Sequence, residues 1–170
     1  MRIETDRLIL RNFEEKDLED LYAMLSDGEV VKYEPYLPMD REAVKQELLQ
    51  RMGSDEFLAM ELKENGRVIG NVYLGKRPFD SAELGYLLAR AYWKQGYAGE
   101  ACRAAVEQVF NGGVHRIYAE CDPENAASWR LLERLGFERE ARLKQNVFFW
   151  RDREGNPIWK DTFIYGKLNG

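Results

Sequence analysis

The chain has 170 residues, of which 45% are hydrophobic and 12% aromatic, and this predicts one folded domain spanning residues 1–170 rather than a disordered chain. Its 25 Lys and Arg against 30 Asp and Glu give a net charge of −5, which argues against a nucleic-acid partner and leaves room for a cationic one, such as an amine. Two cysteines and one histidine exclude a disulfide scaffold and a multi-histidine metal centre. No apolar run approaches the roughly 18 residues of a membrane span, and no signal peptide precedes the first strand, so we expect a soluble cytoplasmic protein without a metal.

Hydrophobic periodicity predicts a strand, two helices and a three-stranded meander in the first half of the chain. Apolar residues recur at i, i+3, i+4 and i+7 from Leu18 onward, and a second helix follows Asp40, a residue type that suits an N-cap. An aromatic loop at residues 33–38 joins these helices, and its two prolines keep it extended. The dipeptide Asn65-Gly66 indicates a hairpin. The strands expected in this half lie at residues 8–10, 57–62, 68–74 and 83–88.

The second half alternates helices and strands before ending in a hairpin. An apolar stripe from Ala98 to Phe110 predicts a long helix. Because this helix connects the strands at 83–88 and 117–121, those strands should run parallel, whereas the hairpins are antiparallel. The expected class is therefore α/β (α+β), with a mixed sheet and helices packed on it. The remaining elements are a strand at 117–121, a helix at 128–135 and two strands, around 142–150 and 158–168.

The segment YWKQGYAGEA at residues 92–101 carries the clearest chemical signal. It follows a strand and opens the long helix, where backbone N–H groups are unpaired and the helix dipole is positive. The small residues Gly96, Ala98 and Gly99 would let a pyrophosphate approach this backbone, and Lys94 adds a cation. The alternative is that the small residues only ease helix–sheet packing. Neither a P-loop nor a dinucleotide-binding glycine motif is present.

An ordered set of motifs covers nearly the whole chain. They are ETDRLILR at 4–11, AELGY at 82–86, WKQGYAGEA at 93–101, NAAS at 125–128 and LGF at 135–137. Together they resemble the GNAT superfamily of acyl-coenzyme A-dependent N-acyltransferases, most closely the branch of the ribosomal-protein N-terminal alanine and serine acetyltransferases. The resemblance implies a mixed, mostly antiparallel sheet of about seven strands with helices on both faces. It also implies acetyl-coenzyme A as the cofactor and an amine as the acceptor.

The same resemblance assigns the cofactor contacts. The superfamily's pyrophosphate motif is [QR]-x-x-G-x-[GA], in which Gly96 and Ala98 fill the small positions, while Trp93 stands where Gln or Arg is usual. Main-chain groups of the preceding strand would bind the pantetheine arm, and Asn125 would contact it from the next helix. The implied cofactor-binding residues are Tyr86, Leu87, Leu88, Trp93, Lys94, Gln95, Gly96, Tyr97, Ala98, Gly99, Asn125 and Ser128.

Acetyl transfer needs a neutral amine and a protonated thiol leaving group. Glu83 and Glu120, on neighbouring strands, are the candidate bases, acting through a water if the distance demands it; the alternative is that both are solvated charges on a strand face. Many superfamily members use a tyrosine as the acid, but Leu132 fills that position, so the resemblance implies Ser128 instead. Ser128 also lies where a side chain would cap the helix.

The acceptor is open at this stage. By resemblance, the acceptor cleft would be lined by aromatic residues: Tyr33, Tyr36, Phe148 and Trp150. A protein N-terminus, a polyamine, an aminoglycoside and an amino acid all remain candidate acceptors, and the protein could be a monomer or a homodimer. A different class is a coenzyme A-binding sensor or partner-binding module without transferase activity, which the missing tyrosine motivates.

Overall fold

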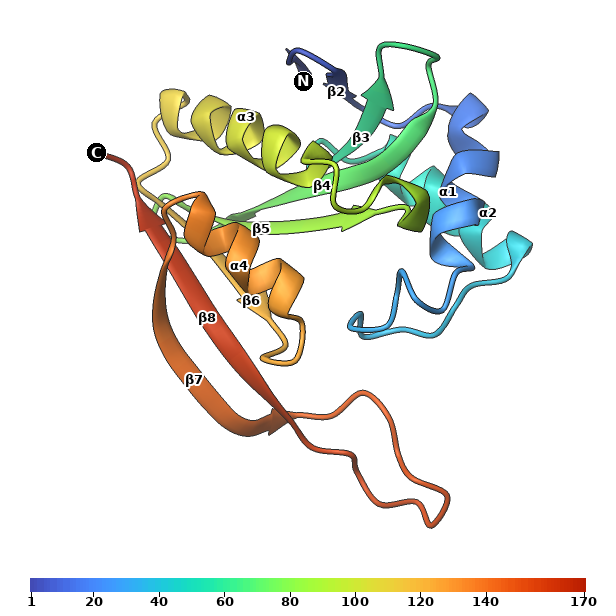
Figure 1. Ribbon diagram of the computed structural model, residues 1–170, viewed down its shortest axis with the longest axis vertical. Helices are drawn as coiled ribbons and strands as arrows, with labels where there is room; N and C mark the ends of the chain where they lie inside the picture. Colours follow the sequence, from blue (N-terminus) through green and yellow to red (C-terminus); the bar gives the residue numbers. More distant parts are fainter.

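A computed structural model describes all residues, 1–170, and its centre is one eight-stranded mixed sheet (Figure 1). The strand order is β1-β2-β3-β4-β5-β6-β8-β7, and every neighbouring pair is antiparallel except β5 and β6. The strands are β1 (Arg2–Glu4), β2 (Leu8–Arg11), β3 (Phe57–Leu62), β4 (Val68–Arg77), β5 (Ser81–Leu88), β6 (Arg116–Cys121), β7 (Glu138–Val147) and β8 (Lys160–Leu168).

Helices cover both faces of the sheet. In Figure 1, α3 and α4 lie over one face, and α1 and α2 pack together beside β3 and β4. No helix is long and apolar enough to cross a membrane. The helices are α1 (Leu18–Leu25), α2 (Arg41–Met52), α3 (Tyr97–Asn111) and α4 (Ala126–Arg134), with short 3₁₀ turns η1 (Glu15–Asp17) and η2 (Arg90–Tyr92).

The two faces bury two separate apolar cores. Successive side chains of a strand point to opposite faces, so a strand that is covered on both sides is apolar at consecutive positions. On β3, Leu58 and Met60 pack with the residues of α3 and α4, whereas Ala59 between them packs with those of α1 and α2. This double burial explains why the central strands are continuously hydrophobic rather than alternating.

The predicted order of helices and strands is confirmed, including the parallel pair. Asp40 caps α2, with its carboxylate accepting from the Ala43 N–H at 2.8 Å. Two details were wrong. The sheet has eight strands rather than about seven, because the exposed three-residue β1 is too short to show a periodic pattern. The strand expected around 142–150 ends at Val147, after a register irregularity at Gln145, where φ is +47°.

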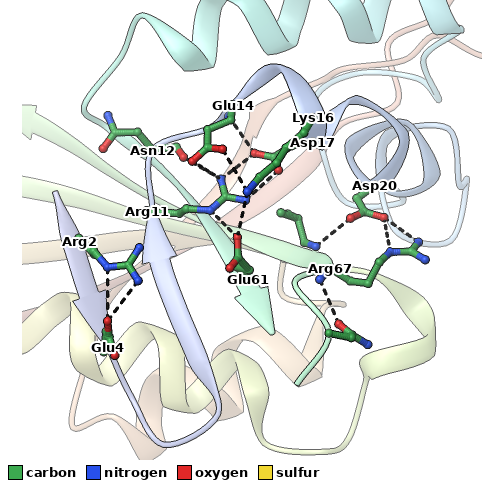
Figure 2. A network of polar contacts seen from close by, with 12 residues as sticks. Arg2, Glu4, Arg11, Asn12, Glu14, Lys16, Asp17, Asp20, Glu61 and Arg67 are labelled. Carbon is green, nitrogen blue, oxygen red and sulfur yellow. Dashed lines mark hydrogen bonds and ion pairs between the residues drawn. The ribbon is translucent and has the colours of Figure 1, made fainter. Parts of the chain in front are cut away.

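A buried arginine fastens the N-terminal strands to the first helical turn. Figure 2 shows Arg11 of β2 between Asp17 of η1 and Glu61 of β3. Its two terminal nitrogens each donate to Asp17 at 2.8 Å, and its Nε donates to Glu61 at 2.6 Å. Arg11 and Asp17 are both buried, so each charge depends on the other for compensation.

Candidate active site

The parallel strands β5 and β6 separate soon after they meet. They pair only over residues 81–83 and 116–118, although both strands continue beyond these positions. The sheet therefore opens between residues 84–88 of β5 and 119–121 of β6, and we call this opening the wedge. In Figure 1 the strands on either side of it run in clearly different directions, with α3 and α4 over the same face. The wedge leaves a length of strand backbone without a ladder partner.

Main-chain groups of β5 face the wedge. The Ala89 N–H donates to a carbonyl of β4 at 2.8 Å, and the alternation of an antiparallel ladder then directs every second residue toward β4. The main-chain groups of Leu87 accordingly point to β4, and those of Tyr86 and Leu88 point to the wedge. The Leu88 carbonyl is already taken, because the Trp93 indole N–H donates to it at 2.7 Å. Both main-chain groups of Tyr86 and the Leu88 N–H are thus directed into the opening.

The wedge leads to the N-terminus of α3, which has no side-chain cap. Gly96 is the N-cap residue, with φ of +84°, and it has no side chain to offer. The first bond within the helix runs from the Glu100 N–H to the Gly96 carbonyl, so the amides of residues 97–99 have no partner in the protein. Lys94 lies exposed two residues before the cap, also with positive φ, at +60°. These unpaired N–H groups and the helix dipole suit an anion.

The small residues of this segment serve different purposes. Gly96 is required by its left-handed backbone, a conformation that L-residues rarely adopt. Gly99 allows close packing, since a Cβ there would lie 3.3 Å from the Leu131 side chain of α4. Ala98 packs against the core on the α3 side. Helix packing thus accounts for Gly99 and Ala98, whereas the anion site at Gly96 and the amides of residues 97–99 stays a prediction.

Tyr86 and Ser128 meet across the wedge. The Tyr86 hydroxyl lies 2.8 Å from the Ser128 Oγ and 3.0 Å from the Ser128 carbonyl oxygen. Asn125 caps α4, and its side-chain oxygen accepts from the Ser128 N–H at 3.4 Å. Burial raises the pKa of Tyr86 above its ordinary value, so its hydroxyl stays protonated. The predicted acid Ser128 thus has a phenol as its immediate partner, delivered by β5 rather than by α4.

Glu83 lies at the last paired position before the wedge, in register with Tyr118. Its carboxylate is held by the Arg77 guanidinium at 2.5 Å and by the Tyr118 hydroxyl at 3.4 Å. Arg77 also donates to the Tyr73 hydroxyl at 3.0 Å. The Glu83 carboxylate is therefore a member of a polar network on the sheet face opposite α3 and α4.

Glu120 lies two residues beyond Tyr118 on β6 and so shares its face of the sheet. No hydrogen bond or ion pair in the protein engages its carboxylate, in contrast to that of Glu83. Glu120 is exposed, and its partial desolvation raises its pKa; the negative charge of Glu83 raises the pKa further, and Arg77 offsets part of this effect. The two predicted bases are thus brought close enough to interact, and Glu120 is the unengaged one.

The aromatic loop between α1 and α2 reaches the start of α4. The Tyr33 hydroxyl donates to the Glu124 carbonyl at 3.3 Å, which links this loop to the segment that follows β6. Tyr36 instead packs against the core under α1 and α2, and burial raises the pKa of its hydroxyl. Of the two tyrosines predicted at the acceptor cleft, Tyr33 lies beside the segment between β6 and α4, and Tyr36 packs inside the loop.

The other two predicted aromatics lie in the loop between β7 and β8, which projects from the body of the molecule in Figure 1. The Phe148 ring meets Trp159 edge-on, with centroids 5.2 Å apart, and Arg151 stacks over it at 4.9 Å. The Trp150 carbonyl accepts from the Ile158 N–H at 3.0 Å. This loop and the one at Tyr33 flank the same side of the molecule without touching through any hydrogen bond or ring contact.

Sequence reasoning missed three residues of this region. Tyr118 and Glu120 are two residues apart on β6 and share a face of the sheet, so the two-residue period of a strand could have identified Tyr118. Arg77 ends β4 and is brought beside Glu83 by the β4–β5 hairpin, which the expected turn at 78–80 could have indicated. Arg7 binds Gln95, just before α3, although the two residues are 88 positions apart in the sequence. No local pattern predicts such a contact.

Known proteins resemble this chain over most of its length. A family model described as an acetyltransferase (GNAT) domain matches residues 7–138. An uncharacterized N-acetyltransferase of Bacillus subtilis, YnaD, is 33% identical over 99% of this chain and 97% of its own length. The ribosomal protein uS5-alanine N-acetyltransferase of Escherichia coli is 31% identical over 89% and 87%. The crystal structure of a GNAT-family acetyltransferase from Bacillus anthracis superposes with a TM-score of 0.91 at 31% identity, covering 99% of both chains.

Proposed function

Because the chain belongs to the GNAT family of acetyltransferases, we propose that it transfers the acetyl group of acetyl-coenzyme A to a primary amine by direct attack in a ternary complex. Membership makes it an acyl-coenzyme A-dependent acetyltransferase. The observation that carries the finer proposal is the wedge, which runs from the carboxylates Glu83 and Glu120 to the unpaired amides at the start of α3. We further propose that residues 1–170 act as one domain and work in the cytoplasm, where free cysteines persist.

The wedge and the start of α3 offer polar groups that suit each part of a coenzyme A molecule. Residues 94–99 would hold the pyrophosphate through their amides and Lys94, and Tyr86 and Leu88 would bind the pantetheine arm through main-chain groups. Asn125 would border the arm from the start of α4, and Trp93 would fix the end of β5 by its bond to Leu88. When bound, acetyl-coenzyme A supplies the activated acetyl thioester, so the chain needs no nucleophilic side chain of its own.

Glu120 is the base that we propose. An α-amine has a reference pKa of about 7.7–8.0 and a lysine one of about 10.4, so a protein N-terminus needs little help to lose its proton near neutral pH. A carboxylate whose pKa is raised by partial desolvation and a neighbouring charge is a stronger base than an ordinary glutamate. Glu120 would accept the amine proton, through a water where the distance requires one. The negative charge of Glu83 would raise the pKa of Glu120, and Arg77 would hold Glu83 in place.

Ser128 is the proposed hydrogen-bond donor to the leaving thiolate. The thiol has a pKa of about 8.5 if cysteine is the guide, so the leaving group needs only weak assistance. The Tyr86 hydroxyl has one proton and two acceptors in reach, the Oγ and the carbonyl oxygen of Ser128. When Tyr86 donates to the Oγ, the Ser128 proton is free to point into the wedge. Tyr86 would therefore decide where the serine proton points.

The acceptor would enter between the two aromatic loops. Tyr33, supported by Tyr36, would form one wall, and Phe148 and Trp150 the other. The relative that acts on the alanine of ribosomal protein uS5 makes a protein N-terminus the first acceptor to test, with small-molecule amines second. Both are cationic below their pKa and would be attracted by the net charge of −5.

Two measurements test this function. Calorimetry with acetyl-coenzyme A should show micromolar binding, and thiol release should be observed with at least one member of a panel of N-terminal peptides, polyamines and other amines. Absence of binding would contradict the assignment of the wedge. Binding without turnover of any amine would favour the alternative of a coenzyme A sensor, which family membership makes the weaker hypothesis.

A further inference from the structure

Arg7, in the connection between β1 and β2, reaches the start of α3. Its Nε donates to the Glu100 carboxylate at 2.7 Å, and its Nη1 donates to the Gln95 carbonyl at 2.9 Å. Its backbone N–H donates to the other oxygen of Glu100 at 2.9 Å. The guanidinium also stacks over the Tyr97 ring, 4.1 Å from the ring centroid. A single side chain thus contacts three residues in and around the first turn of α3.

Glu100 is itself anchored, so Arg7 is held in a fixed orientation. The Thr5 hydroxyl donates to Glu100 at 2.6 Å, from the same connection that carries Arg7. Burial raises the pKa of Glu100, but the hydrogen bonds from Thr5 and Arg7 outweigh this and leave its pKa below the ordinary value. Glu100 therefore remains a charged partner for Arg7 throughout the neutral range.

The loop that Arg7 contacts has an unfavourable backbone conformation. Lys94 and Gly96, on either side of Gln95, both have positive φ, a region that is unfavourable for a non-glycine residue such as Lys94. The Gln95 carbonyl between them is the group that Arg7 binds. In a trans peptide the carbonyl and the following N–H point in opposite directions, so fixing this carbonyl on Arg7 aims the Gly96 N–H away from it.

The loop also lacks a residue that the family motif usually provides. Trp93 stands where Gln or Arg is usual, and its indole N–H is used on the Leu88 carbonyl, within the protein. The polar anchor at this loop comes instead from Arg7. Its Nη2 has no partner in the protein and lies 3.3 Å from where a Cβ on Gly96 would be.

We infer that Arg7 is a positioning residue for the cofactor loop, residues 93–96. It fixes the Gln95 carbonyl away from the anion site, so that the Gly96 N–H and the helix amides face the pyrophosphate. This inference rests on the proposed function, because it concerns the same coenzyme A site. It adds a role for a segment nearly ninety residues away, which the loop motif does not contain.

The test compares Arg7→Ala, Arg7→Lys and Glu100→Gln with Arg2→Ala as the matched control, because Arg2 lies in the adjoining strand β1 and pairs only with exposed Glu4. Dissociation constants are measured by calorimetry for coenzyme A and for 3′-dephospho-coenzyme A, alongside kcat, KM for acetyl-coenzyme A, and Tm. We expect Arg7→Ala to weaken both ligands about tenfold and to raise KM similarly, with kcat changed by less than about twofold. Arg2→Ala should match the wild type.

Arg7→Lys keeps the charge but cannot donate to Glu100 and Gln95 in the same forked geometry, so we expect it to recover less than half of the lost factor. Glu100→Gln should weaken the affinity for both ligands about threefold, because it weakens the contact that holds Arg7 in place. The inference is overturned if Arg7→Ala binds as the wild type does, if Arg7→Lys restores full affinity, or if the loss affects only the ligand with the 3′-phosphate. It is also overturned if kcat and Tm fall together with affinity. Failure of the wild type to bind either ligand would instead refute the proposed function.

Discussion

The pair Tyr86 and Ser128 gives the most direct test of the proposed chemistry. Tyr86→Phe removes the hydroxyl that lies 2.8 Å from the Ser128 Oγ and 3.0 Å from its carbonyl, while the ring that fills the space remains. Ser128→Ala removes only the first of these contacts, because the carbonyl belongs to the backbone. The two substitutions therefore separate the loss of the proton donor from the loss of the group that orients it.

The structure sets the expected magnitudes. Tyr86→Phe should lower the free energy of unfolding by about 1 kcal/mol, the usual net value of a partly buried hydrogen bond, and Ser128→Ala by less, since the Tyr86 hydroxyl keeps the carbonyl. Ser128→Ala should lower kcat about 10- to 100-fold. This is a small effect for the loss of a general acid, because a thiol with a low pKa leaves with little assistance. Tyr86→Phe should lower kcat about tenfold in the wild-type background, because the serine proton is no longer directed.

The double-mutant cycle shows whether Tyr86 acts by orienting Ser128 or contributes to catalysis independently of it. If Tyr86 acts through Ser128, then Tyr86→Phe should have almost no further effect on kcat once Ser128 is alanine. Steady-state kinetics at saturating acetyl-coenzyme A and acceptor gives kcat for all four proteins, and urea unfolding gives their stability. An equal loss of kcat from Tyr86→Phe in both backgrounds would refute the reasoning, and so would an unchanged kcat in both single variants.

Further predictions concern the carboxylates and the buried ion pair. If Glu120 is the base, kcat/KM should fall with decreasing pH through the pKa of Glu120, which lies above the ordinary 4.5; Glu120→Gln should abolish this acid limb. Glu83→Gln removes the negative charge that raises the pKa of Glu120, so it should shift the acid limb to lower pH, and a shift to higher pH would contradict the proposed coupling. Asp17→Ala leaves the buried charge of Arg11 without its bidentate partner and should lower the free energy of unfolding by about 3–5 kcal/mol. Glu4→Ala, at an exposed pair, should leave urea unfolding unchanged, and equal effects of the two substitutions would contradict the importance of burial.

The elements that the sequence predicted are those whose signals are local. The cap Asp40, the hairpin at Asn65-Gly66 and the glycines that end α3 each act on the few residues around them, and each lies where it was expected. β1 was missed because it is stabilised by pairing with β2 rather than by its own pattern; its three residues are mostly exposed. The end of β7 was misplaced because Gln145 turns the chain with a positive φ. The Gln145 N–H donates to the carboxylate of Asp161 in the neighbouring strand β8.

The candidate site divides in the same way. The backbone part, the glycine at the start of α3 and the small residue behind it, was predictable because a helix N-terminus and a left-handed glycine follow from neighbouring residue types. The partners of the side chains were not. Tyr86 was predicted only for its main chain, since nothing within the AELGY motif indicates that the phenol crosses the wedge to Ser128.

The two glutamates show most clearly what the sequence lacks. Glu83 and Glu120 are the same residue type on neighbouring strands, and from residue type and spacing they could not be given different roles. The register of the β4–β5 hairpin separates them, because it pairs Arg77 with Glu83, whereas Glu120 has no ion-pair or hydrogen-bond partner. An engaged carboxylate supplies a fixed charge, whereas an unengaged one whose pKa is raised by that charge can exchange protons. The proposed choice of Glu120 as the base therefore depends on tertiary pairing, and the direction of the pH shift in Glu83→Gln tests it directly.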